Sequence, residues 1–406
     1  MTVELVYAPT LALYRFNETH PLRPERFTLA VDLMRAWGLL DDAKPTSPAR
    51  ALVLEPSDPS RALVVQPAPV DDEDLLRVHC ADYIFAVQQA GYGPEFWHGA
   101  FGIGDGDTPP FRDMHMASAR VAGATMRALD HVLAGVCRRS FSPAGGLHHA
   151  QRDHAAGFCV YNDLAIAIAR ATALGSAERI AYVDVDVHHG DGVQAAFYSR
   201  ADVLTVSVHE SGRYLFPGTG RIEEMGEGQG AGFSVNLPLP PGAGDECFEA
   251  AFERVIAPAV RAFSPDAIVA QLGADSHLND PLAHLNTTVA GQYATTKQLI
   301  GLADEVCGGR IAATGGGGYD TYSAVPRAWA CAMAALLGVA APAGLPESWR
   351  EAVAQVAPEG EPPAPHATFE EPPRELWLQP GGNPLPETER TIERLRTAHP
   401  LLRDAG

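Results

Sequence analysis

The sequence predicts an α/β fold in which a parallel sheet is covered by helices on both faces. Short apolar runs alternate with longer segments of helical periodicity along most of the 406 residues. Runs such as AIVAQL (residues 267–272) are almost wholly apolar, as expected of a parallel strand buried on both faces. A chain with 46% hydrophobic and 20% charged residues is globular, which excludes disordered and fibrous proteins. The predicted strands are residues 3–7, 62–66, 140–144, 179–187, 203–208, 233–237, 267–272 and 310–314.

Helices are predicted between these strands, which favours a doubly wound arrangement. The acidic run 71–74 predicts a helix start, because carboxylates are favoured at the positive end of a helix. Residues 328–345 are uncharged and long enough to span a membrane. Their alanines, two glycines and Pro342 instead indicate a buried helix. The longer predicted helices are residues 114–134, 163–173, 246–263, 289–306 and 324–337.

Two domain-level units are predicted. Residues 1–340 form one catalytic domain that carries the motifs described below. Residues 341–406 form a Pro-rich extension: its first part, to 385, is expected to be a covering tail or linker, and a short helix at 387–397 is expected to pack on the catalytic domain. Residues 41–61 carry four prolines without clear periodicity and are expected to be peripheral.

Charge and cysteine usage limit the partners and the compartment. The formal net charge is −20, which disfavours nucleic acid and anionic membranes and favours cationic partners such as basic peptides or polyamines. The six cysteines include no C-x-x-C pair, which is typical of a reducing compartment. Residues 1–15 show no secretory pattern, so a cytoplasmic location is predicted.

The motif DVDVHHGDG follows the predicted strand 179–187 and carries Asp184, Asp186 and His188. Because side chains alternate along a strand, these three are expected to share one face. Asp275 follows another strand, and if the two strands are neighbours it completes a three-ligand set with Asp186 and His188. Three protein ligands leave one coordination position open, as in a catalytic zinc site, although the two carboxylates keep iron(II) or manganese open as alternatives. The other interpretation is a polar strand end without metal.

A pair of adjacent histidines, His148 and His149, also follows a predicted strand. Asp184 and Asp191 are candidates to accept the second ring N–H of each, which would fix the tautomer and raise basicity. The pair is therefore interpreted as an acid/base pair. The alternative is two solvent-facing loop histidines.

The run TGGGGY ends at Tyr319. No G-K-[ST] follows, which excludes a P-loop. Glycines such as Gly317 allow close approach of backbone to a substrate, and the Tyr319 hydroxyl could stabilise an oxyanion opposite a metal. Phe158, next to Gly157, and Phe216 are aromatic residues in loops that could form a narrow apolar slot.

Five motifs, in this order and spacing, resemble the zinc-dependent histone deacetylase family. They are PAGGLHHAQRDHAAGFCVYND, YVDVDVHHGDGV, SVH…LFPGTG, QLGADSHLNDPLAHL and GGGGY. Within this family, the bacterial acetoin-utilisation deacetylases look most similar. The resemblance covers most of the chain and implies the arginase/deacetylase fold, a three-layer α/β/α arrangement with a central parallel sheet of about eight strands.

The resemblance also implies an activity and its catalytic residues. The activity is hydrolysis of Nε-acetyl-lysine to lysine and acetate on acetylated proteins, with acyl-CoA synthetases among the substrates of bacterial relatives. It implies a metal bound by Asp186, His188 and Asp275. The catalytic residues that it implies are His148 and His149, supported by Asp184 and Asp191, and Tyr319 as oxyanion donor.

Substrate and potassium sites are implied in the same way. Phe158, Phe216, Gly157 and Gly317 would line the acyl-lysine channel, and Asp107 would hold substrate backbone at the rim. A structural potassium ion is expected near the metal. The residues at its matching positions are Asp184, Asp186, His188, Ser207 and Val208.

Three alternatives remain open from the sequence. An acetylpolyamine amidohydrolase would use the same residues on a small cationic substrate. A catalytically inactive acyl-lysine binding module is disfavoured because the ligands, both histidines and Tyr319 are all present. A two-metal enzyme of the arginase type remains open because His277 stands where two-metal members carry an aspartate. Arg221 is a further departure, since many relatives have an acidic residue after FPGTG.

Overall fold

A nine-stranded sheet runs through the centre of the protein, in the order β2-β3-β1-β4-β9-β8-β5-β6-β7. The computed structural model describes residues 2–41, 58, 60–96, 99–104, 106–361, 364–371 and 383–403. Every strand pairs with its neighbours in parallel, and all eight predicted strands are present. The additional strand is β2, two residues long, at one edge. The bounds are β1 Val3–Val6, β2 Leu40–Asp41, β3 Ala62–Val65, β4 Arg139–Ser142, β5 Ile180–Asp184, β6 Val203–Glu210, β7 Ser234–Leu239, β8 Ala267–Gln271 and β9 Ile311–Thr314.

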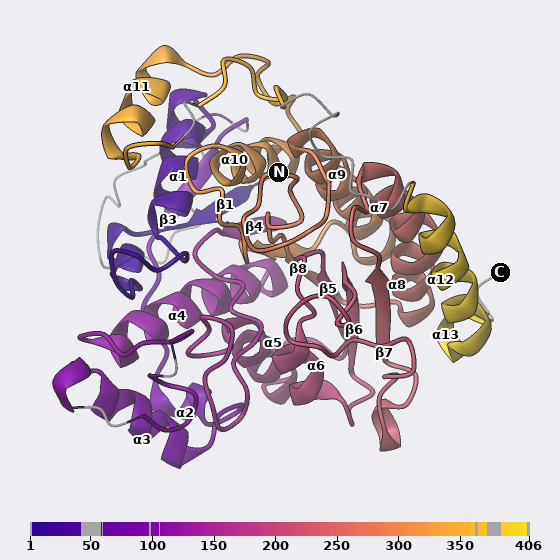
Figure 1. Cartoon of the computed structure of the whole chain (residues 1–406). Coiled ribbons are helices and arrows are strands. Elements are labelled where there is room, and N and C mark those ends of the chain that lie inside the picture. The colour runs from indigo at the N-terminus through magenta and orange to yellow at the C-terminus, as the bar shows by residue number, and fades with distance from the viewer. Residues whose placement is uncertain are drawn as a thin grey trace.

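Helices cover both faces of the sheet, which confirms the three-layer α/β/α fold (Figure 1). One face is covered by α1 Glu25–Ala36, α10 Ala324–Leu337, α9 Val289–Cys307, α7 Asp245–Ala251 and α8 Ala257–Phe263. The other face is covered by α4 Met114–Leu133, α5 Asp163–Ala173 and α6 Asp191–Phe197. Outside α4 lie α2 Asp72–Leu75 and α3 Ala81–Ala90, and the 3-10 turns are η1 Pro9–Leu13, η2 Pro94–Phe96 and η3 Gly228–Gly230.

Helix α10 is buried along almost its whole length, as its apolar sequence predicts. The Trp329 indole N–H donates to the Leu272 carbonyl at 2.8 Å, which ties the helix to the end of β8. Gly338, with φ of 72°, ends it. No helix in the described ranges is long and apolar enough to cross a membrane.

The predicted helix 246–263 contains a π-helical turn, η4 Phe252–Ile256, between α7 and α8. Pro258 has no N–H, so it cannot donate to the Arg254 carbonyl four residues earlier. That carbonyl accepts from the Arg396 guanidinium at 2.9 Å instead. The irregularity of the helix therefore provides an acceptor for a residue near the C-terminus.

The C-terminal part contains more structure than the sequence predicted. The expectation of a tail or linker at 341–385 was wrong for α11 Glu347–Val356, whose buried Trp349 donates to the Leu29 carbonyl of α1. The predicted terminal helix is α12 Leu385–Ala398, which lies beside edge strand β7, and it is followed by α13 Pro400–Arg403, which contacts α8 (Figure 1). The division of the chain at residue 340 stays a prediction. Most of the predicted 41–61 insertion lies outside the described residues.

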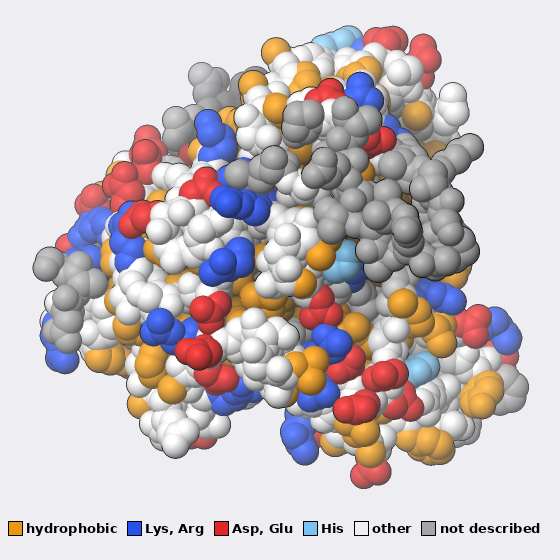
Figure 2. Space-filling view, turned by 180° about the vertical axis from the view of Figure 1, so that it is seen from behind, with side chains coloured by type: hydrophobic (Ala, Val, Ile, Leu, Met, Phe, Trp, Pro, Cys, Tyr) orange, Lys and Arg blue, Asp and Glu red, His pale blue; other side chains and the backbone are white. Residues whose placement is uncertain are grey.

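Charged side chains of both signs are interspersed on the face turned away from the viewer of Figure 1 (Figure 2). On this face the acidic excess of the chain is not gathered into one patch. The described side chains of this face therefore do not form a single acidic surface (Figure 2).

Candidate active site

The predicted metal-ligating and catalytic residues gather at the carboxyl ends of β4, β9, β8 and β5, which are consecutive in the sheet. In open parallel sheets this edge is where ligand sites form. Strand β5, however, ends at Asp184, so the expectation that Asp184, Asp186 and His188 share one strand face was wrong. The Asp184 carboxylate accepts from the Asp186 N–H at 3.1 Å, and the Asp186 carboxylate accepts from the His188 N–H at 3.0 Å. These local bonds turn the backbone out of the strand.

Asp186, His188 and Asp275 come together without a shared strand. One ligand atom from each lies within 4.8 Å of the others. His188 Nδ1 is 3.2 Å from Asp186 Oδ1 and 3.0 Å from Asp275 Oδ2. Both carboxylates are fully buried and His188 is 8% exposed. The Val187 N–H donates to Asp275 Oδ1 at 2.9 Å, which joins the two ligand-bearing segments.

The two buried carboxylates of this cluster favour a positive charge close to them. Burial opposes a charged His188 ring, but the hydrogen bonds and charges of Asp186 and Asp275 outweigh it and raise its pKa to about 10. Burial and the Asp186 charge raise the pKa of Asp275 to about 6. Two adjacent buried carboxylates are costly unless a cation compensates them. The donor set, two carboxylate oxygens and one imidazole nitrogen, therefore fits a divalent metal ion.

His148 and His149 form a hydrogen-bonded pair. Their Nε2 atoms are 3.0 Å apart. His148 Nδ1 lies 2.8 Å from Asp184 Oδ2, and His149 Nδ1 lies 2.7 Å from Asp191 Oδ1. Both rings are buried, so the alternative of solvent-facing loop histidines was wrong.

The two rings differ in proton affinity although each has a carboxylate partner. For His148 burial lowers the pKa, but the charges of Asp184 and Asp186 outweigh burial and raise it to about 9. For His149 burial and the neighbouring His148 charge lower the pKa to about 4. At neutral pH the pair therefore carries one positive charge, on His148, and His149 keeps an acceptor nitrogen.

Tyr319 lines the same pocket as the two histidines and the ligands Asp186 and His188. Burial raises the pKa of its hydroxyl well above the ordinary value, so the group is a neutral donor. The Tyr319 N–H donates to Asp280 at 2.7 Å, and Asp280 follows Asp275 in the same loop. The pocket lining includes Leu22, His148, His149, Asp186, His188 and Tyr319.

The predicted channel aromatics border this pocket from two directions. The Phe216 ring is 5.0 Å from the His149 ring and is 43% exposed. The Phe158 ring is 5.7 Å from the Tyr319 ring, edge to face. Phe158 has φ of 67°, and the Tyr14 hydroxyl donates to its carbonyl at 2.7 Å, which holds this uncommon conformation. Asp107 is exposed on the surface near Phe158: its carbonyl is 3.0 Å from His20 Nε2, and the His20 ring is 4.6 Å from the Phe158 ring.

Two of the predicted glycines are required by close approach. A Cβ on Gly317 would lie 1.8 Å from Asp275 Oδ2, and the Gly317 N–H donates to Asp186 at 2.7 Å. A Cβ on Gly157 would lie 2.4 Å from the His149 ring, and its φ is 50°. Gly317 therefore contacts the ligands directly, in addition to lining the pocket.

Three buried residues that the sequence analysis did not assign also support the site. The Gln271 amide donates to Asp186 at 2.7 Å, and the Tyr182 hydroxyl donates to Asp184. Asp163 accepts from the N–H groups of Gly146 and Leu147, which orients the histidine turn. The sequence signal that could have identified two of them is a polar side chain within or next to an apolar motif, namely Gln271 in AIVAQL and Asp163 in VYND.

Among the described residues, His277 lies outside the group of side chains that could hold a metal ion. Its Nε2 is 3.1 Å from the Glu371 carboxylate. Across the described part of the chain, one group of three metal-ligating side chains is present, namely Asp186, His188 and Asp275. The two-metal interpretation of His277 therefore finds no support in the ligand geometry.

Comparison of the sequence with models of known protein families identifies the family of this chain. A family model described as "Histone deacetylase domain" matches residues 20–336, which is more than half of the chain. The chain belongs to the histone deacetylase family.

Within the histone deacetylase family, similar relatives are named "Acetoin utilization protein AcuC". The protein of this name from Bacillus subtilis (strain 168) is 40% identical over 346 residues, which are 85% of this chain and 84% of that protein. The one from Staphylococcus xylosus is 37% identical over 351 residues, 86% of each chain. These relatives support the acetoin-utilisation branch of the family.

Solved structures of histone deacetylase homologues share the fold. The crystal structure of an HDAC homolog complexed with SAHA superposes with a TM-score of 0.81 at 30% identity, over 97% of this chain and all of that chain. The HDAC homolog from Aquifex aeolicus gives 0.80 at 31% identity with the same coverage. The arginase/deacetylase fold implied by the motifs is therefore confirmed.

Proposed function

We propose that this histone deacetylase family member is a metal-dependent lysine deacetylase that hydrolyses Nε-acetyl-lysine to lysine and acetate. The observation that carries the proposal is the meeting of two groups in one buried pocket. These are the ligand set Asp186, His188 and Asp275 and the hydrogen-bonded pair His148 and His149. Hydrolysis of an amide needs an electrophilic centre, a base for water and an acid for the leaving amine. This pocket offers residues for each role.

Asp186, His188 and Asp275 would hold one divalent cation, for which zinc is proposed and iron(II) is the alternative. Bound there, the ion would supply a polarised substrate carbonyl and a water of lowered pKa. The Gln271 amide and the Gly317 N–H both donate to Asp186 and orient its carboxylate.

His149 takes the proton from the attacking water, because its pKa of about 4 leaves Nε2 unprotonated at neutral pH. Asp191 at Nδ1 keeps the ring in the required tautomer and stabilises the imidazolium that forms. His148 stays positively charged beside it, and one of the two rings then protonates the leaving lysine amine.

The Tyr319 hydroxyl donates to the oxyanion that develops on the substrate carbonyl. Its high pKa keeps the proton on the oxygen throughout the reaction. Removal of one such donor typically costs about 10²–10³ in turnover. Asp280 holds the Tyr319 backbone, so the hydroxyl is presented from a fixed loop.

Phe158 and Phe216 supply apolar walls for the four methylenes of an acyl-lysine side chain. Burial of each methylene contributes about 0.8 kcal/mol. The proposed partners are proteins with acetylated lysines in the cytoplasm. Acyl-CoA synthetases are included, and Asp107 would contact the substrate backbone at the rim, because the family resemblance implies both.

A structural potassium ion is proposed at the positions implied by the family resemblance. The register of the sheet supports it, because Asp184 on β5 pairs with Ser207 on β6. Val208 follows on the same strand and is fully buried. The ion would rigidify the start of the ligand-bearing turn.

The proposal is tested by acetate release from an acetyl-lysine peptide and from N-acetylspermidine, each before and after chelation. We expect a higher kcat/KM on the peptide, loss of activity with chelator and recovery with zinc. His154→Gln, at a histidine that is exposed on the surface, is the control and should match the parent. Preferential hydrolysis of N-acetylspermidine would make the protein a polyamine deacetylase, and activity that resists exhaustive chelation would contradict a metal role.

A further inference from the structure

The carboxylate of Glu371 lies behind the loop that carries Asp275. We define the Asp275 loop as residues 272–288, between β8 and α9. Glu371 Oε1 accepts from the Val289 N–H at 3.0 Å, and Oε2 lies 3.1 Å from His277 Nε2. The side chain is 12% exposed. Glu371 lies outside residues 20–336, so the family match gives it no role.

The segment that carries Glu371 is anchored on α10. The Arg327 guanidinium donates to the carbonyls of Thr368 at 3.0 Å and Glu370 at 2.9 Å. Its Nη2 also lies 3.4 Å from the Glu371 carboxylate. Arg327 is 1% exposed, so these bonds form in a buried environment where they hold firmly. The position of Glu371 is therefore set by the core of the protein.

His277 transmits this anchor to the loop. Its Nδ1 accepts from the Asn279 N–H at 3.1 Å, so the ring proton is on Nε2 and donates to Glu371. The His277 N–H donates to the Ala274 carbonyl, directly before Asp275. Three residues further on, Asp280 accepts from the Tyr319 N–H. One turn therefore links Glu371 both to Asp275 and to Tyr319.

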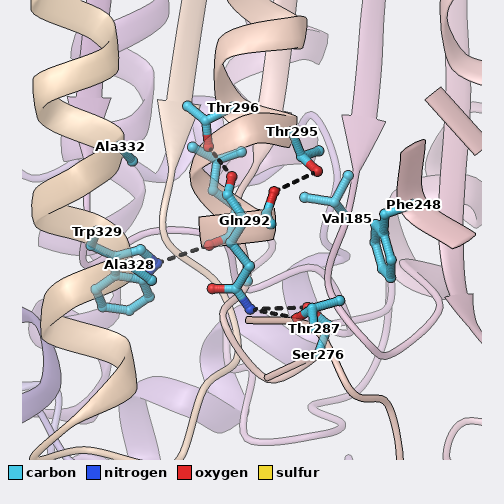
Figure 3. A pocket seen from close by; sticks show the side chains of 13 residues that line it. Val185, Phe248, Ser276, Thr287, Gln292, Thr295, Thr296, Ala328, Trp329 and Ala332 are labelled. Carbon is cyan, nitrogen blue, oxygen red and sulfur yellow. Dashed lines mark hydrogen bonds between the residues drawn. The ribbon is translucent and has the colours of Figure 1, made fainter. Parts of the chain in front are cut away.

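A second link runs through the start of α9. Glu371 accepts from the Val289 N–H in the first turn, where an acidic group is favourable. From the next turn, the Gln292 side chain extends to Ser276 and Thr287, and its amide donates to the Ala274 carbonyl at 3.2 Å (Figure 3). Glu371 therefore fixes the helix end from which Gln292 holds the loop.

The loop depends on these polar links because a pocket lies behind it. The pocket is bordered by α9, α10 and α7 (Figure 3). Its lining includes Val185, which lies between Asp184 and Asp186, together with Leu272 and Gly273 of the loop. A cavity removes packing contacts from the backbone that borders it. Hydrogen bonds then carry a larger share of the loop's restraint.

We propose that Glu371 is a positioning residue that sets the orientation of Asp275 and Tyr319. This inference rests on the proposed metal-dependent function and extends it to the C-terminal segment. Loss of the carboxylate leaves the His277 Nε2–H and the Val289 N–H without their acceptor. The loop then becomes less restrained, which lowers the affinity for the metal ion and displaces Tyr319.

The test compares Glu371→Ala and Glu371→Gln with the parent, using the full chain. Zinc dissociation constants are measured by competition with a chelating indicator, and kcat and KM are measured at saturating zinc. For Glu371→Ala we expect a dissociation constant raised about tenfold or more, within the range for residues that orient metal ligands. We also expect a lower kcat at saturating zinc with KM changed little. Glu371→Gln should be intermediate, because its amide oxygen can still accept from Val289 while its NH₂ meets the donors of His277 and Arg327.

Glu370→Gln is the matched control. Glu370 is exposed. Among the described residues, its carboxylate accepts hydrogen bonds only from the N–H groups of His366 and Ala367, which belong to its own segment. It should bind zinc and turn over like the parent. Unchanged zinc affinity and kcat in Glu371→Gln, and in Glu371→Ala if that variant folds, would overturn this inference but not the proposed function. A parent that binds no zinc would overturn the proposed function together with the inference.

Discussion

The Nε2 atoms of His148 and His149 lie 3.0 Å apart, while their Nδ1 atoms are paired with two different aspartates. Two positive charges so close repel each other strongly, so the resting pair carries one proton between the two Nε2 atoms at neutral pH, and a second charge on His149 forms only during the reaction. Asp184 is fully buried and also accepts from the Tyr182 hydroxyl. The charges of Asp184 and Asp186 raise the pKa of His148, while burial and the His148 charge lower the pKa of His149, so the charge lies on His148 and His149 is the acceptor.

The pH dependence of turnover should follow this asymmetry. Because the pKa of His148 is about 9, its charge is lost above pH 9 and kcat/KM should fall there. In Asp184→Asn the negative charge that raises this pKa is removed, so the alkaline limb should move to lower pH. Rate profiles from pH 6 to 10 measure it, at saturating zinc. An alkaline limb that stays in place would show that His148 does not produce it.

Tyr319→Phe should lower kcat by about 10²-fold while the bound metal is retained, since a hydroxyl donor is lost and no ligand is touched. Tyr293→Phe is the matched control, because the Tyr293 hydroxyl donates to the Val339 carbonyl outside the pocket. Zinc content and single-turnover rates of both variants check the prediction. Equal turnover in Tyr319→Phe and the parent would remove the oxyanion role.

Gly317→Ala should weaken metal binding, because the new Cβ would lie 1.8 Å from the Asp275 carboxylate oxygen. Gly301→Ala is the control: Gly301 lies on the exposed side of α9 with nothing within 4 Å of an added Cβ. Alanine in a helix there should be neutral or slightly stabilising. Zinc titration of both variants is the measurement, and wild-type affinity in Gly317→Ala would mean that the ligands tolerate displacement.

His79→Gln should flatten the pH dependence of stability. Burial lowers the pKa of His79 to about 4. Its Nε2 accepts from the Asn162 N–H, so a proton on that nitrogen would face a donor. Between pH 6.5 and 4 the unfolded chain binds a proton that the folded chain does not, so stability is lost as the pH falls. From pH 7.5 to 5 this contribution is about 2 kcal/mol. Gln keeps a donor and an acceptor but does not titrate.

Urea unfolding at both pH values compares the parent, His79→Gln and His154→Gln, whose histidine is exposed. The loss of stability between pH 7.5 and 5 should be smaller only in His79→Gln. An equal loss in all three proteins would contradict the buried neutral ring.

The sequence predicts much of this site because parallel strands bring their carboxyl ends to one edge. Asp275 could be placed near Asp186 and His188 only on the condition that their strands are neighbours, and β5 pairs with β8. The strand boundary could not be predicted, since it depends on which N–H each aspartate accepts. Asp184 ends β5 by accepting from Asp186, which apolar alternation does not reveal.

Contacts that are distant in sequence were beyond prediction for a different reason. Glu371 meets His277 across 94 residues of chain, and the Pro-rich sequence around it carries no periodicity that points to the loop. Helix α11 had a local signal, because Trp349 and Val353 are spaced four apart after Pro346 and both are buried. The proline content of the surrounding segment obscured this signal in the prediction of a tail.

The central claim is that one metal ion at Asp186, His188 and Asp275 supports amide hydrolysis. It is tested most directly by titrating the metal-free protein with zinc while acetyl-lysine peptide hydrolysis is followed, in the parent and in Asp186→Asn. We expect activity to rise to a plateau at one equivalent of zinc in the parent and to be lost in Asp186→Asn. Hydrolysis by the metal-free protein, a plateau at two equivalents, or parent-like activity in Asp186→Asn would contradict the claim.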